Sequence, residues 1–159
     1  MNVKEIKINH ILEQGFELFS KEGIDNVTMN NIADKAEIGV ASLYRYFSTK
    51  EELAIQCATK MWQKEKEKAI DIFTSEKYLE KTGKDQLEEI LNYFETSFDT
   101  TQDFYRFIYY FDSYIKRQNI ESSNLQNYEN TIEEITQIAF QAIEKGFSDG
   151  SISYPKGNI

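Results

Sequence analysis

The segment from residue 28 to 53, TMNNIADKAEIGVASLYRYFSTKEEL, constrains the fold more than any other part of this sequence. Ile32 and Ala33 lie at helical spacing after Thr28, whose hydroxyl is suited to cap a helix. Gly39 then fits a turn, because a residue without Cβ adopts turn and cap conformations at little cost. The segment therefore predicts a short helix followed by a tight turn.

A second helix pattern follows at residues 40–47. Leu43 and Phe47 lie four residues apart and can pack inward, which leaves the polar and amphipathic residues between them for the surface. Ser48 and Glu51 form an S-x-x-E pattern, so we expect a capping box at the start of a third helix. Two short helices at this spacing are typical of a helix-turn-helix, which presents its second helix to the major groove of DNA.

Residues 11–53 resemble the DNA-binding domain of the TetR family of transcriptional regulators. The residues that carry the resemblance are Leu18, Phe19 and Gly23 in the first helix, Thr28, Ile32 and Ala33 in the second, and the run LYRYF with Lys50, Glu51 and Leu53 in the third and fourth. Two departures concern the turn. Glu37 stands where members often carry Gly, and Gly39 and Ala41 stand where a capping Ser and a Gly are frequent.

The resemblance implies an all-α protein with two domains. A three-helix head with the helix-turn-helix occupies residues 1–48, and an antiparallel helical bundle for ligand sensing and dimerisation occupies residues 49–159. The composition agrees, since one Pro and seven Gly among 159 residues favour helices. Similar proteins usually carry two further helices that form a dimer interface. Either this chain is truncated, or it dimerises differently, through an apolar stripe formed by Phe140, Ile143 and Phe147.

Apolar periodicity predicts longer helices on both sides of the helix-turn-helix. They cover residues 4–21, 49–73, 85–98, 102–118 and 125–146; residues 74–85 are predicted to contain a loop, and residues 148–159 a turn-like tail. Because the helix at 49–73 belongs to both the head and the bundle, a tilt at its far end would move the recognition helix.

The resemblance implies DNA contacts on the exposed face around the second short helix. The residues expected to bind DNA are Thr28, Val40, Ala41, Ser42, Tyr44, Arg45, Tyr46 and Lys50. Among them Val40, Ala41 and Arg45 are candidates for base edges, and an Arg reads guanine through two hydrogen bonds. In the alternative interpretation Tyr44 and Tyr46 only pack the head, and Arg45 faces phosphates or solvent.

The net charge of −9 is unfavourable for a polyanionic partner, but the charge is unevenly distributed. Residues 1–52 carry six basic and nine acidic side chains, a net charge of −3, whereas residues 38–50 carry Arg45 and Lys50 and no acid. We therefore expect site-specific DNA binding with weak non-specific affinity.

Residues 93–114 are rich in aromatic side chains, with ten of the 22 in the chain. Each of them alone fits an ordinary core, but as a group they can line a cavity for a flat or lipophilic effector. The candidate ligand-binding residues are Phe94, Phe98, Phe104, Tyr105, Ile108, Tyr109 and Asp112. Asp112, together with the aromatic faces, would favour a cationic ligand.

Catalysis is not expected. His10 and Cys57 are the single histidine and the single cysteine, and they belong to different predicted helices. The sequence has no Gly-rich phosphate loop, no E-x-x-H pair and no Cys/His cluster with zinc spacing, so we expect neither a cofactor nor a metal. Cys57 is expected to be a small buried apolar residue, with a reactive thiol as the alternative. No apolar run approaches a membrane span, and we expect a cytoplasmic protein.

These features predict a ligand-responsive transcriptional regulator. It would be a repressor that binds a palindromic operator in double-stranded DNA as a homodimer and is released by a small lipophilic or aromatic effector. The alternative is a helical protein-binding or assembly module that does not bind DNA.

Overall fold

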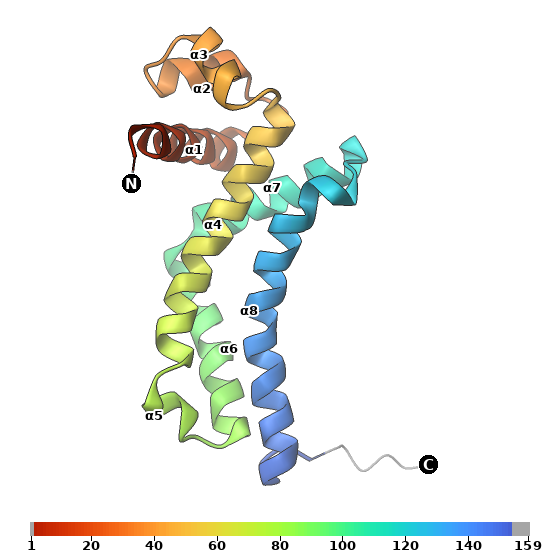
Figure 1. Ribbon diagram of the computed structural model, residues 1–159. Helices are drawn as coiled ribbons and strands as arrows, with labels where there is room; N and C mark the ends of the chain where they lie inside the picture. Colours follow the sequence, from red (N-terminus) through yellow and green to blue (C-terminus); the bar gives the residue numbers. More distant parts are fainter. Residues whose placement is uncertain (1, 154–159) are drawn as a thin grey trace. The chain divides into compact units, whose positions relative to one another are not determined.

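The computed structural model describes residues 2–153, and every regular element in this range is an α-helix (Figure 1). The helices are α1 (Val3–Glu22), α2 (Met29–Lys35), α3 (Val40–Tyr46), α4 (Lys50–Phe73), α5 (Glu76–Leu79), α6 (Gly83–Thr100), α7 (Gln102–Gln118) and α8 (Ser122–Asp149). The all-α fold with an N-terminal helix-turn-helix and a C-terminal helical bundle is therefore confirmed.

The chain divides into two compact units. Unit 1 contains the described part of Met1–Trp62 together with Thr101–Glu129, and unit 2 contains Gln63–Thr100 together with the described part of Asn130–Ile159. Helices α4 and α8 each contribute one part to unit 1 and the other part to unit 2. The domain boundary after residue 48 stays a prediction.

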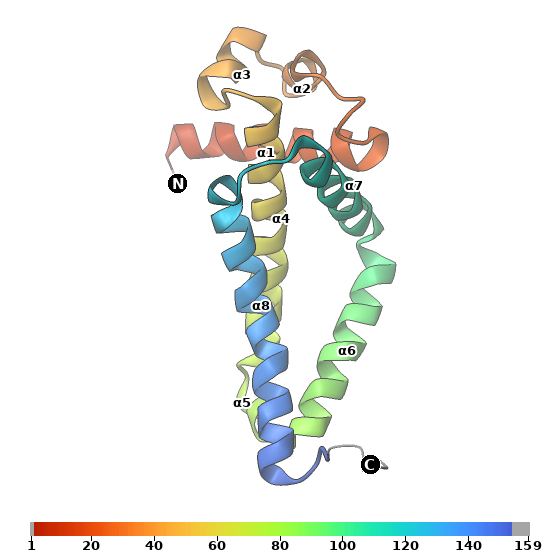
Figure 2. The same cartoon turned by 90° about the vertical axis from the view of Figure 1, so that its right-hand side faces the viewer.

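In unit 1, α1 lies between the α2–α3 pair and α7 (Figure 2). Phe19 on α1 is fully buried, and its ring stacks on that of Phe107 of α7 with the centroids 6.2 Å apart. Phe16 meets the same Phe107 ring edge-on at 5.4 Å. This aromatic contact buries a large apolar area, so α7 and the head share one core.

The first part of α4 completes that core with Leu53 and Cys57, both at 0% exposure. The thiol of Cys57 donates a 3.3 Å hydrogen bond to the carbonyl oxygen of Leu12 on α1. Cys57 is thus a small buried residue, as the apolar interpretation predicted.

In unit 2, the second part of α4, helix α6 and the second part of α8 run in alternating directions (Figure 1). Their core contains Ala69 and Phe73 of α4, Tyr78 of α5, Ile90 of α6 and Ala142 of α8. These small and aromatic side chains from four helices fill one shared interior.

Two glycines allow α6 and α8 to approach closely. A Cβ atom on Gly83 would lie 2.0 Å from the backbone nitrogen of Gly146. No side chain fits at that distance, so Gly83 is required by space rather than by backbone conformation. The end of α8 also caps the start of α6, because Asp149 accepts a 2.8 Å hydrogen bond from the N–H of Gly83.

Several predicted helix boundaries were wrong in detail. The predicted loop at 74–85 contains the short helix α5, which Ser75 caps through the N–H of Tyr78. Helix α6 begins at Gly83 rather than after Asp85, and the hydroxyl of Thr82 accepts from the N–H of Asp85. Helix α7 spans the predicted residues.

The C-terminal end also differs. Helix α8 continues three residues beyond the predicted end at Gly146, to Asp149. The remainder of the predicted turn-like tail, residues 154–159, lies outside the described residues.

Candidate nucleic-acid interface

Helix α2 is held at its start by a capping box. The hydroxyl of Thr28 accepts a 3.2 Å hydrogen bond from the N–H of Asn31, and the amide oxygen of Asn31 accepts from the N–H of Thr28 at 2.8 Å. Ile32 and Ala33 then point into the core, with exposures of 0% and 1%. The predicted cap and inner face of the first short helix are therefore both present.

The turn between α2 and α3 is made by Glu37 rather than by Gly39. Glu37 has φ 56°, in the left-handed region that favours glycine, whereas Gly39 has φ −64° and is the N-cap of α3. Gly39 thus takes the cap conformation, one of the two that were expected of it, and the left-handed residue is Glu37. The glutamate tolerates the strained position because helices fix the backbone on both sides.

Helix α3 is anchored on one face and open on the other. Leu43 and Phe47 are buried at 0% and 1% exposure. Tyr44 is 51% exposed and Val40 38% exposed, and Ala41 and Arg45 are exposed as well. An outward face of this kind is what a recognition helix needs, and the side chains of Tyr44 and Arg45 are not covered by other helices.

The remaining residues expected on this face are partly engaged within the head. Ser42 and Tyr46 are half-buried, and Thr28 is exposed. The guanidinium of Arg45 donates a 2.8 Å hydrogen bond to the hydroxyl of Ser42, one turn earlier on α3. This contact holds the Arg45 side chain along the helix while its charge remains at the surface.

Lys50 has a different environment from the other candidates. Its ammonium donates hydrogen bonds to the backbone carbonyl oxygens of Ile24 at 2.8 Å and Val27 at 3.0 Å. The ring of Tyr114 on α7 lies 5.8 Å from the same nitrogen, a cation–π contact. Lys50 therefore binds the loop between α1 and α2.

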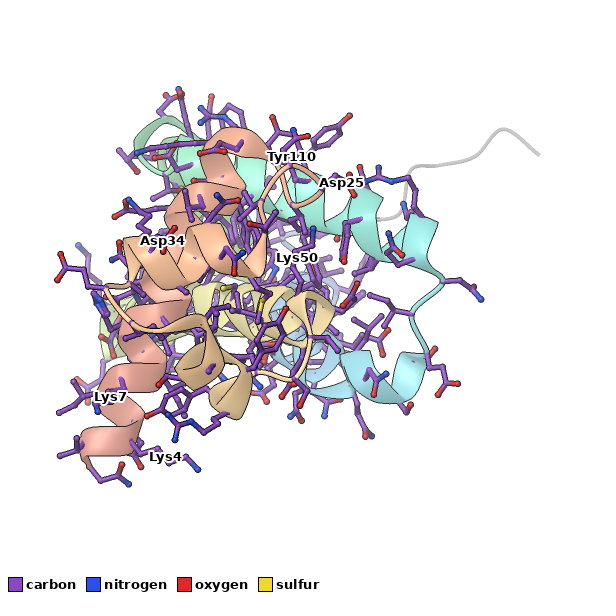
Figure 3. The ribbon with its side chains drawn as sticks, turned by 90° about the horizontal axis from the view of Figure 1, so that it is seen from above. Lys4, Lys7, Asp25, Asp34, Lys50 and Tyr110 are labelled. Carbon is purple, nitrogen blue, oxygen red and sulfur yellow. The ribbon has the colours of Figure 1, made fainter. Side chains whose placement is uncertain are left out.

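Helix α7 makes two further polar contacts with the head. The hydroxyl of Tyr114 donates a 2.8 Å hydrogen bond to Glu51, and Arg117 forms an ion pair with Asp25, which lies in the loop between α1 and α2 (Figure 3). Burial of Tyr114, with its bond to Glu51, raises the pKa of that phenol. Backbone and Tyr114 hydrogen bonds lower the pKa of Glu51.

The predicted capping box of Ser48 and Glu51 was wrong by one residue. Thr49 caps α4 by accepting from the N–H of Glu52 at 3.1 Å, and the carboxylate of Glu52 accepts from the N–H of Ser48 at 2.8 Å. The neighbouring S-x-x-E and T-x-x-E patterns are equivalent in sequence. The two patterns differ only in the structure, where Glu51 accepts from Tyr114 of α7 and Glu52 is left to cap the helix. Tyr114 is remote from Glu51 in the chain, so the sequence pattern does not show this contact.

The candidate ligand-binding residues are divided between the two units. Phe94 and Phe98 belong to unit 2, and Phe98 is 54% exposed. The candidates in unit 1 are Phe104, Tyr105, Ile108, Tyr109 and Asp112. Within unit 1, Phe104 is buried at 6% exposure and Tyr109 is 70% exposed, so α7 presents its aromatic residues on more than one face.

One polar contact inside unit 1 was not predicted from the sequence. The hydroxyl of Tyr128 on α8 donates a 3.2 Å hydrogen bond to Asp112. Burial is the larger cause, and the charge of Asp112 the next, of the raised pKa of Tyr128. Trp62 packs edge-on against Phe104 at 5.0 Å. Its buried indole N–H acts on the Tyr128 hydroxyl and lowers the pKa of that phenol, against the larger effects of burial and Asp112. The apolar periodicity of α8 placed Tyr128 in the core but gave no sign of its partner on α7.

Among residues 2–153, no three His, Cys, Asp or Glu side chains come together as ligands for a metal ion. Within the same range, no helix combines the length and apolar character needed to span a bilayer.

Comparisons with known proteins agree with this geometry. The family model of bacterial regulatory proteins, tetR family, matches residues 11–57, which include α2, α3 and the start of α4. An HTH-type transcriptional regulator of Staphylococcus aureus (strain USA300) is 42% identical over 52 residues, covering 31% of this chain and 28% of that protein. The match thus spans just over a quarter of the curated relative's length.

Solved structures extend the likeness to the rest of the fold. A TetR-family regulator from Mesorhizobium loti MAFF303099 superposes with a TM-score of 0.76 at 14% identity, over 94% of this chain and 72% of that chain. A regulator from Saccharomonospora viridis, solved in complex with choline, gives 0.67 at 17% identity, over 92% and 72%. Residues 11–57 therefore carry the sequence of the DNA-binding domain of the TetR family, and the described chain has the fold of solved TetR-family regulators.

Proposed function

We propose that this protein is a ligand-responsive transcriptional regulator, a repressor that a small effector releases from its operator. The observation that carries the proposal is the two-sided burial of α3, in which Leu43 is fully buried and Tyr44, the next residue, is 51% exposed. A helix about 10–12 Å wide fits the major groove, which is about 12 Å wide. An anchored helix with an open outer face is suited to enter it.

The proposed base contacts come from the exposed residues Val40, Ala41 and Arg45 of α3. The Arg45 guanidinium reads guanine, and the two apolar side chains are suited to thymine methyl groups. Tyr44, Tyr46, Ser42 and Thr28 offer hydroxyl groups to phosphates, which position the protein without reading sequence.

The proposed operator is a palindrome bound by two copies of the chain. Two recognition helices about 34–36 Å apart reach successive major grooves, so the half-sites lie one helical turn apart or a multiple of it. Selection of bound DNA from a random pool tests this directly. The expected product is an inverted repeat with that spacing; a pool that stays random after several rounds would contradict the proposal.

The proposed effector site is the aromatic group in unit 1 around Trp62, Phe104, Tyr128 and Asp112. A carboxylate beside aromatic faces suits a cation with an apolar surface, because both contribute to its binding. The choline complex of the Saccharomonospora viridis regulator supports a cationic ligand for a protein of this fold.

Trp62 is the single tryptophan of the chain, so its fluorescence reports on this group. Titration with choline and with a benzyl-trimethylammonium ion is expected to change the emission, whereas neutral analogues of equal size bind more weakly. Asp112→Asn should abolish the preference for the cation. Asp99→Asn, an exposed change on α6 in unit 2, is the matched control. Equal binding of cations and neutral analogues would reject the cationic effector.

Release from DNA requires that the effector bind the DNA-free form more tightly than the DNA-bound form. A coupling free energy of about 1–3 kcal/mol, equivalent to ~5–150-fold in operator affinity, is typical of such regulators. The expected result is that effector and operator weaken each other's binding by the same factor.

A protein-binding module remains the second candidate, because Val3 and Ile6 of α1 are 70% and 53% exposed. Salt separates the two functions. Operator binding weakens steeply with ionic strength, since phosphate contacts release counterions. A module that binds through apolar side chains would show no such dependence and no preference for a DNA sequence.

A further inference from the structure

The positive charge available near α3 is smaller than the sequence indicates. Lys50 is bound to the carbonyl oxygens of Ile24 and Val27, and Lys35 forms a 2.9 Å ion pair with Glu17. Only Arg45 remains as a basic residue on α3 itself. A head with a net charge of −3 over residues 1–52 therefore needs further cations to approach DNA.

Lys4 and Lys7, in the first two turns of α1, meet this need. Both are exposed, and within residues 2–153 neither has an ion pair or a hydrogen bond. The intervening acid, Glu5, does not neutralise them by contact, because its carboxylate accepts from the backbone N–H and the side-chain amide of Asn2 at 3.0 and 3.1 Å. The two ammonium groups are thus available to a partner.

Packing does not explain why α1 begins as early as Val3. All residues from 2 to 7 are exposed, and the first buried residue of the helix is Ile11. The start is nevertheless held by the capping box of Asn2 and Glu5. A capped helical extension keeps both lysines on a rigid rod, so binding there orders little additional backbone.

The extension is the end of α1 that lies next to the recognition helix. Figures 2 and 3 show the N-terminal half of α1, with Lys4 and Lys7, alongside α3, while its C-terminal half lies alongside α2. In helix-turn-helix complexes the first helix of the motif, which is α2 here, crosses the sugar-phosphate backbone beside the groove that the recognition helix occupies. The start of α1 lies next to α3 at the end away from α2, where the backbone on the other border of that groove passes. A lysine there meets phosphate oxygens rather than base edges.

We propose that Lys4 and Lys7 bind DNA phosphates that border the groove occupied by α3, and that they supply charge which Lys50 does not. The proposal rests on the DNA-binding function above. It assigns these lysines to positioning and affinity, not to sequence readout, because phosphate contacts carry no base information.

The test compares the salt dependence of operator affinity in the full chain, with the operator taken from the random-pool selection. Lys4→Gln/Lys7→Gln should reduce the magnitude of the slope of log K against log[KCl] by about 0.9 for each lysine, ~1.8 for each bound protomer. Lys21→Gln, in the last turn of α1, is the matched control and should leave the slope unchanged. Helix content by circular dichroism checks that the fold is retained.

The ratio of operator affinity to scrambled-DNA affinity should stay within about twofold in the double variant, since both affinities lose the same phosphate contacts. A slope equal to that of the wild type would overturn the proposal. So would an equal loss in the Lys21→Gln control, because the effect would then be one of general charge. Failure of the wild type to distinguish operator from scrambled DNA would reject the DNA-binding function itself.

Discussion

The ammonium group of Lys50 donates a 3.0 Å hydrogen bond to the carbonyl oxygen of Val27, the residue immediately before the cap of α2. Its second bond, to Ile24, reaches the other end of the same loop. Lys50 lies in the first turn of α4, which follows α3 directly. One side chain therefore ties the entrance of the helix-turn-helix to its exit.

Replacement of this lysine should reveal a positioning role. Lys50→Met keeps the apolar stem and removes the charged donor, and loss of hydrogen bonds from a charged group costs about 1.5–3 kcal/mol of unfolding free energy. Lys7→Met, an exposed change on α1, should stay within about 0.5 kcal/mol. Both are measured by urea denaturation.

The salt slope of operator binding distinguishes this role from the phosphate contact predicted from the sequence. A positioning lysine lowers affinity at every salt concentration and leaves the slope unchanged. If Lys50→Met instead lowers the magnitude of the slope by about 0.9 without loss of stability, Lys50 binds phosphate in the complex.

Replacement of the turn residue Glu37 by glycine should raise the unfolding free energy. A left-handed conformation costs a residue with a Cβ about 1–2 kcal/mol, and glycine avoids this cost. Roughly half of the resulting gain in stability is lost again, because glycine has more freedom in the unfolded chain. Glu37→Gly is therefore expected to raise the unfolding free energy by about 0.5–1 kcal/mol. Gly39→Ala, at φ −64° with open space around the new Cβ, should change it little. Destabilisation by Glu37→Gly would show that the glutamate side chain contributes more than its backbone costs.

The helix-turn-helix could be predicted from sequence because its signals are local. The cap at Thr28, the inward pair Leu43 and Phe47, and the exposed Tyr44 all follow from spacing within one or two turns. Residue type did not assign the left-handed conformation to a glutamate; the resemblance marked Glu37 as a position where members often carry Gly, and the surrounding helices impose the conformation on it.

The environment of Lys50 was missed for a related reason. Its acceptors, Ile24 and Val27, are backbone oxygens more than twenty residues away in the chain, and backbone groups leave no mark in a sequence. The same applies to the choice between Glu51 and Glu52 as the capping acid, which Tyr114 of α7 decides. Long-range contacts, rather than local propensities, determine the environment of Lys50 and the choice of the capping acid.

The close approach of α6 and α8 predicts a strong effect at Gly83. Overpacking of a well-packed interior costs about 1–3 kcal/mol, and more where the new atom meets backbone. Gly83→Ala places a Cβ 2.0 Å from the nitrogen of Gly146, so we expect a loss at or above the upper end of that range. Chemical denaturation measures it. A loss below about 0.5 kcal/mol, the level of an ordinary surface change, would show that the two helices separate readily.

Cys57 should be unreactive in the native protein. Burial raises the pKa of its thiol strongly, and the thiolate is the reactive form. Modification by a disulfide reagent near neutral pH is expected only at the rate of unfolding, with one thiol per chain released for reaction in denaturant. Complete modification within seconds under native conditions would support the reactive-thiol alternative.

Sequence readout by the exposed face of α3 is the part of the proposed function on which the rest depends. The most direct measurement is the ratio of affinities for the selected operator and for scrambled DNA of the same length, at about 0.15 M salt, for the wild type and Arg45→Ala. We expect a ratio of at least about 10³ for the wild type. Arg45→Ala should lower it by ~1–3 kcal/mol, about 5–150-fold. A wild-type ratio near one, unchanged by Arg45→Ala, would show that α3 does not read DNA sequence.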